Sequence, residues 1–180
     1  MSHPFSFLSA GQRARLFWIC LALTLAAMAV LQRVDAPLRT AAAPQGIVSF
    51  ELAGDLPTAQ AILASWDART RIFAGFSLGF DYLFMPLYAA SIALALAWAA
   101  AQWRGGWIAR LGLGLAWGQV VAALCDAVEN LALWRLLGGG GEPWPALAQS
   151  MALIKFGLIG LGLLYALAGV GRWLLRRGRA

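Results

Sequence analysis

The sequence predicts an all-α membrane protein, built as a bundle of four transmembrane helices. Of its 180 residues, 61% are hydrophobic and only 12% are charged, whereas a soluble domain carries about 25% charged residues. Four apolar segments are predicted as membrane spans, and they cover about residues 16–33, 73–103, 107–136 and 146–175. They leave little room for a soluble domain, so residues 1–180 are predicted to form a single integral membrane domain.

The first predicted span has an alternative interpretation. Its apolar run is short for a transmembrane helix, and Ala27-Met28-Ala29 resembles the cleavage site of a secretory signal peptide. The apolar run continues through Val30 and Leu31, beyond that site. A retained span is therefore the prediction, and removal as a signal peptide is the alternative.

The connection of about residues 34–71 is the only long polar segment, and it begins with a turn-rich stretch. Residues 58–69 are predicted to form a short amphipathic helix, with Pro57 near its start. Because this helix is too short to span the bilayer, we expect it to lie on the membrane surface or to cap the bundle. Residues 50–54 either form a plain loop or dip toward the bundle.

Arginines predict the orientation of the spans. Lysine and arginine collect at the cytoplasmic ends of transmembrane helices. Here they mark both termini and the second connection, at Arg13, Arg15, Arg104, Arg110, Arg172, Arg176, Arg177 and Arg179. Both termini are therefore predicted to be cytoplasmic in a bacterial inner membrane, with the 34–71 loop outside. The net charge of +6 is then explained by orientation and lipid headgroups, and no nucleic-acid partner is predicted.

Several chemistries are excluded by the residues that are missing. The single histidine, His3, lies outside the spans, so a histidine metal site, a Ser-His-Asp triad and a histidine base are unavailable within the bundle. No Walker, Rossmann, HExxH or CxxC motif occurs. Cys20 and Cys125 are predicted at different depths, too far apart for a disulfide. We therefore predict no cofactor and no metal, and enzymatic activity is disfavoured.

Ionisable side chains within the spans mark the candidate site. A charge at the bilayer centre costs roughly 2.5–3.5 kcal/mol, so such residues face the bundle interior and pair. In the predicted orientation they all fall in the outer half of the bundle. The predicted site consists of these residues and two polar neighbours: Asp81, Tyr88, Asp126, Glu129, Asn130 and Lys155.

Two interpretations of this set remain open. Lys155 could pair with Asp126 or Glu129 and fix the helix register without any ligand. Alternatively, the set lines a polar cavity that binds or moves something. Three acids facing one lysine leave excess negative charge, so a proton or an outside cation is needed. The predicted functions are binding of a lipid or a small amphiphilic or cationic molecule, proton-coupled transport by a homodimer, or a structural role in a membrane complex.

Three segments resemble a family of uncharacterised bacterial four-span membrane proteins: residues 46–54 (GIVSFELAG), 81–84 (DYLF) and 126–130 (DAVEN). This resemblance covers most of the chain and implies the fold but no function. The layout is also distantly similar to the EXPERA group, which includes the emopamil-binding sterol isomerase and the sigma-2 receptor. That similarity rests on the long first loop and the Asp81–Pro86 pattern, and it implies a cationic amphiphile as ligand. Isomerase chemistry is not implied, because the membrane histidine of the sterol isomerase is missing.

Overall fold

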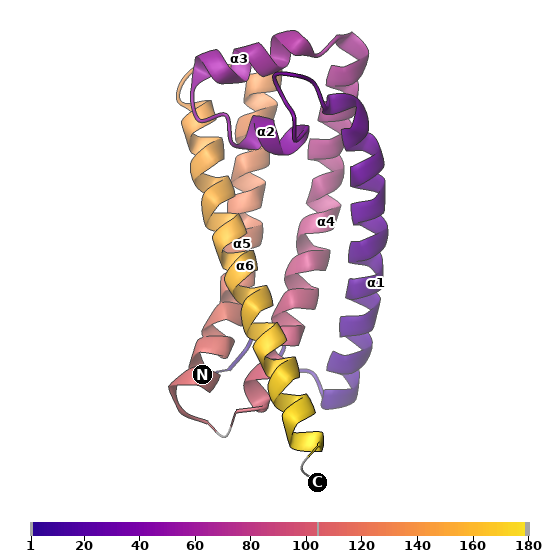
Figure 1. Ribbon diagram of the computed structural model, residues 1–180, viewed down its shortest axis with the longest axis vertical. Helices are drawn as coiled ribbons and strands as arrows, with labels where there is room; N and C mark the ends of the chain where they lie inside the picture. Colours follow the sequence, from indigo (N-terminus) through magenta and orange to yellow (C-terminus); the bar gives the residue numbers. More distant parts are fainter. Residues whose placement is uncertain (1, 104, 179–180) are drawn as a thin grey trace. The chain divides into compact units, whose positions relative to one another are not determined.

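The computed structural model describes residues 2–103 and 105–178. It is 82% helical, and no strand occurs within these two ranges, which confirms the predicted all-helical class. Arg104 and Arg179, two of the arginines used to predict the orientation, lie outside the described residues. The elements, labelled in Figure 1, are α1 (Ala10–Asp35), η1 (Ala36–Leu38), α2 (Ile47–Glu51), α3 (Leu56–Ser65), α4 (Ala68–Ala101), α5 (Gly106–Leu137) and α6 (Trp144–Arg177).

Helices α1, α4, α5 and α6 are each long and apolar enough to cross a membrane, which confirms the prediction of four potential spans. Their lengths of 26, 34, 32 and 34 residues correspond to about 39–51 Å, more than the roughly 30 Å of a hydrocarbon core. Helices α1 and α4 begin at Ala10 and Ala68, before the predicted starts at residues 16 and 73. The physical reason is that a helix continues through the polar interface, whereas hydropathy marks only its apolar part.

The described chain divides into two compact units that share the four long helices. The first unit comprises Met1–Thr24, Pro86–Ala123 and Phe156–Ala180. The second unit comprises Leu25–Met85 and Leu124–Lys155, and it therefore contains α2 and α3.

The first unit packs through small residues. The core includes Leu96, Ala116 and Tyr165. Gly169 lies directly against Ala99, and a side chain at this glycine would overlap the alanine, so α4 and α6 approach closely here. The Tyr165 hydroxyl donates a hydrogen bond to the carbonyl of Ile108 at 2.9 Å, which connects α6 to α5.

The second unit has a core built largely by the connection between α1 and α4. Leu38, Phe50 and Trp66 from this connection pack with Leu78 of α4 and Leu133 of α5. The Trp66 indole donates to the Leu38 carbonyl at 2.8 Å, and its ring meets that of Phe50 edge to face, with centroids 5.3 Å apart. The connection is therefore ordered core structure, and Figure 1 shows α2 and α3 at the end where α4 begins and α5 ends.

Helix α3 differs in position from the amphipathic helix predicted over residues 58–69. It begins at Leu56, because the Asp55 carboxylate caps it by accepting the Thr58 N–H at 2.7 Å. It ends at Ser65, one residue before Trp66 turns into the core. Asp67 then accepts the N–H of Thr70 at 2.7 Å and starts α4. Residues 67–69, the end of the predicted amphipathic helix, therefore belong to the beginning of α4.

Candidate functional site

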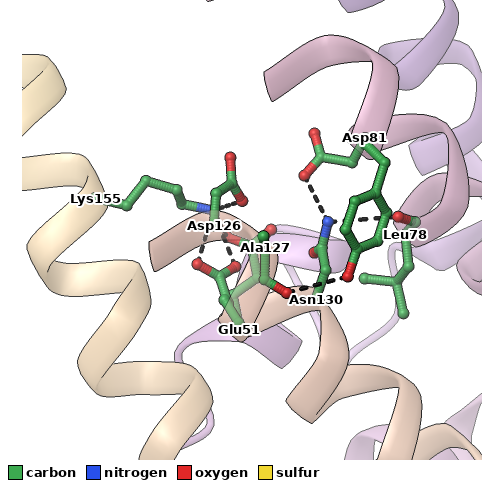
Figure 2. Close-up of polar contacts among 9 residues, drawn as sticks. Glu51, Leu78, Asp81, Asp126, Ala127, Asn130 and Lys155 are labelled. Atoms are coloured by element: carbon green, nitrogen blue, oxygen red, sulfur yellow. Dashed lines mark hydrogen bonds and ion pairs between the residues drawn. The ribbon is translucent and has the colours of Figure 1, made fainter. Parts of the chain in front are cut away.

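The ammonium group of Lys155 is the centre of a buried charged cluster in the second unit. It lies 2.9 Å from Asp126 Oδ1, and 2.9 and 2.8 Å from Glu129 Oε1 and Oε2. Glu51 Oε2 is 3.6 Å away on another side. Figure 2 shows Glu51, Asp126 and Lys155 converging from α2, α5 and α6. We call Glu51, Asp126, Glu129 and Lys155 the lysine cluster.

Helix periodicity explains how α5 supplies two members of the lysine cluster. Asp126 and Glu129 are three residues apart, so they project from the same helix face. Lys155 reaches them from α6, and Glu51 is the last residue of α2. The side chains are removed from solvent: the exposed fractions are 0% for Glu129, 2% for Asp126, 5% for Lys155 and 8% for Glu51. Burial of charge at this level is tolerated only when the charges are paired.

Asp81 and Asn130 form a second polar group beside the lysine cluster. Asn130 is fully buried and donates a hydrogen bond of 2.7 Å to Asp81 Oδ2. The neighbouring Tyr82 hydroxyl donates to the Ala127 carbonyl at 3.0 Å, which joins α4 to α5. Asp81 itself is only half-buried. In Figure 2, Asp81 lies on one side of Asp126 and Lys155 on the other.

The structure thus brings together five of the six predicted site residues. Asp126, Glu129 and Lys155 are in direct contact, and Asn130 links Asp81 to the same region of α5. Tyr88 belongs to the first unit, where its side chain is 4% exposed. Its inclusion in a common site with the other five stays a prediction.

Glu51 is a member of the lysine cluster that the predicted site did not include. It lies in the connection between the first two spans, where residues 50–54 were expected to be a plain loop or to dip toward the bundle. The sequence did contain a signal. Glu51 is a lone acid between Phe50 and Leu52, in a short apolar stretch bounded by Gly46 and Gly54.

Two polar contacts and two glycines fix α2 so that Glu51 faces Lys155. At its start, the Asp35 carboxylate accepts the Ile47 N–H at 2.8 Å. After its end, the Gln149 amide donates to the Leu52 carbonyl at 3.0 Å. Gly46 and Gly54 have φ of 61° and 76°, values that L-residues rarely adopt. A side chain at either position would collide with Asp35 or Gln149.

The lysine cluster has more acid than base. Three carboxyls contact one ammonium group, and Asp81 adds a fourth acid nearby. Burial raises the pKa of Glu51, and attraction to Lys155 opposes that rise. The Glu51 and Glu129 carboxyls both contact the Lys155 ammonium, and two carboxyls that close share one proton more readily than both ionise. The cluster is therefore suited to holding a proton or a cation in addition to Lys155.

The polar groups show no arrangement that indicates a metal centre. Among residues 2–103 and 105–178, no three His, Cys, Asp or Glu side chains are grouped so as to hold a metal ion. Cys20 and Cys125 are free thiols. No protein-family model, curated protein or solved structure matches the chain.

Proposed function

We propose that this is a multi-pass protein of the bacterial inner membrane that binds a small cationic amphiphile or a lipid in the outer half of a four-helix bundle. The observation that carries the proposal is the excess of carboxyl over ammonium groups: Glu51, Asp126 and Glu129 are buried against Lys155, and the half-buried Asp81 lies nearby. Purely structural pairing needs only one acid for each lysine. The additional acids favour a proton or a cation as a further occupant.

The depth of the acids along the helices supports a site in the outer half. Asp81 lies about 20 Å from the start of α4, Glu129 about 12 Å from the end of α5, and Lys155 about 16 Å from the start of α6. These helix ends adjoin the 34–71 connection and the glycine-rich loop of residues 138–143 between α5 and α6, which the arginine distribution predicts to be outside. Because the helices are longer than the hydrocarbon core is thick, the acids fall just inside its outer boundary.

Asp81 is the side chain best placed to receive a cationic head group. The ammonium of Lys155 already contacts three carboxyls, so an anionic ligand would have to displace one of them. Asp81 instead takes Asn130 as its partner and remains half-buried. The adjacent Tyr82 and Leu83 expose large apolar surfaces. An ammonium group attached to an apolar chain therefore matches both the charge and the surroundings of Asp81.

Thermal unfolding in neutral detergent tests the proposal, with dodecylamine as the probe and dodecanol and dodecanoate as comparison ligands. Dodecylamine should raise the midpoint of the wild-type protein, and Asp81→Asn should abolish that increase. Glu142→Gln, which removes an exposed acid of the same unit, should keep it. The proposal is refuted if dodecylamine stabilises the wild type no more than dodecanol does while all variants fold normally.

A proton-coupled carrier is the second candidate, and the approach of the Glu51 and Glu129 carboxyls to the same ammonium group, that of Lys155, favours it. Such a pair can release its shared proton when a cation arrives. Four spans per chain are few for a carrier, so this function would require a homodimer. It predicts a pH-dependent flux in proteoliposomes that disappears in Glu129→Gln. If the cluster is instead structural, Lys155→Met combined with neutral acids should preserve folding and assembly with a partner complex.

A further inference from the structure

Acidic and basic residues are distributed unequally between the two units. All 8 aspartates and glutamates lie in the second unit. The first unit contains no aspartate or glutamate in its sequence, but it carries these arginines: Arg13, Arg15, Arg104, Arg110, Arg172, Arg176, Arg177 and Arg179. Side-chain carboxylates within the first unit therefore cannot neutralise its positive charge, and the countercharge must come from another source.

Two arginines near the end of α6 are held in place by tryptophans. The Arg172 guanidinium lies 4.4 Å from the centre of the Trp103 ring, and its Nε donates to the Gln102 carbonyl at 2.9 Å. The Arg177 guanidinium lies 4.1 Å from the centre of the Trp173 ring. Stacking uses the flat face of a guanidinium and leaves its edge available to a phosphate. Because Arg172 is already held by a ring contact and a hydrogen bond, binding an anion there costs little side-chain entropy.

The aromatic surroundings point to a lipid as the source of that anion. Trp18 and Trp107 of the same unit expose large parts of their side chains. Exposed tryptophans are typical of the level of the lipid headgroups, and arginines there attract anionic lipids. We infer that Arg172 and Arg177 form a binding site for the phosphate of an anionic phospholipid. This site is independent of the lysine cluster and of its ligand.

The stability of the protein in vesicles of defined composition tests this site. The unfolding midpoint is measured in vesicles of phosphatidylcholine alone and in vesicles that contain one part in five of phosphatidylglycerol. The wild type is compared with the double variant Arg172→Gln/Arg177→Gln. Arg69→Gln/Arg135→Gln is the matched control, because these arginines stack on Phe73 and Trp144 in the second unit. Phosphatidylglycerol should raise the unfolding midpoint of the wild type and of the control, and the first variant should lose at least half of that increase.

Three outcomes would overturn the inference. The first is that phosphatidylglycerol raises the unfolding midpoint equally in all three proteins. The second is that the increase in the wild type persists in 1 M NaCl. The third is that inorganic phosphate, added to phosphatidylcholine vesicles, raises the midpoint of the wild type as much as phosphatidylglycerol does. If the double variant fails to fold, tryptophan quenching in the wild type decides. Brominated phosphatidylglycerol should quench more strongly than brominated phosphatidylcholine, and equal quenching contradicts a selective site.

Discussion

Replacing Lys155 with methionine should severely destabilise the protein, because it leaves the acids of the lysine cluster without a countercharge. The Lys155 ammonium lies within 3.6 Å of Glu51, Asp126 and Glu129. Removing one partner of a buried ion pair costs about 3–5 kcal/mol. The acids can recover part of this loss by binding protons, so the defect of Lys155→Met should be smaller at pH 5 than at pH 8.

The measurement is reversible unfolding in mixed micelles, followed by tryptophan fluorescence at both pH values. Leu153→Met, an exposed position on the same helix, controls for the introduction of methionine and should change stability by less than about 0.5 kcal/mol. The combination of Lys155→Met with Asp126→Asn and Glu129→Gln should recover most of the loss, since a neutral cluster has no charge to pair. A loss below about 1 kcal/mol in Lys155→Met at pH 8 would refute this account, because an unpaired buried charge costs more than that.

Three further predictions concern the connection between α1 and α4. Gly46→Ala should lower the free energy of unfolding by at least about 1–3 kcal/mol, because the φ of 61° is strained for alanine and the new methyl group meets the Asp35 carboxylate. Gly105→Ala, at a position with positive φ but open space around it, should lower it by less in the same unfolding assay. Burial raises the pKa of Glu51, so the folded protein binds the proton of this carboxyl more tightly than the unfolded chain does, and stability falls as pH rises above about 4.5. The dependence of stability on pH should be flatter in Glu51→Gln. A pH profile unchanged from that of the wild type would contradict this prediction. Hydrogen bonds from Thr58 lower the pKa of Asp55, so its cap stabilises the fold above the ordinary pKa of the carboxyl and is lost as pH falls through the lowered value. Asp55→Ala should therefore lower the thermal midpoint at pH 7, and this decrease should shrink at progressively lower pH. A decrease of the same size at every pH would contradict the cap.

Hydropathy is sufficient to predict the four long helices, because a membrane span must satisfy its backbone hydrogen bonds internally. It does not predict where the helices end. Helix α4 begins at Ala68 because Asp67 caps it, and that local hydrogen bond has no hydropathy signature. The break between α3 and α4 at Trp66 likewise depends on a tertiary contact, the hydrogen bond of its indole to Leu38.

The candidate site is predictable to the extent that helix periodicity determines it. Periodicity places Asp126 and Glu129 on one face of α5, and the cost of buried charge implies a partner such as Lys155. Periodicity does not reveal which neighbouring helix each face meets, so the pairing of Asp81 with Asn130 required the structure. Glu51 was the hardest residue to predict, because its approach to Lys155 depends on α2 being held at both ends.

Lys155 is the only lysine in the sequence, and this gives the buried cluster a direct chemical reporter. Reagents that acylate primary amines can attack one side chain in this chain, and that amine is shielded by three acids and by α2. The rate at which Lys155 itself gains such a label, measured on the peptide that contains it and so separated from the N-terminal amine, therefore reports how often the cluster opens. Labels meant for the protein surface must accordingly be attached through other side chains, since lysine chemistry would modify the interior.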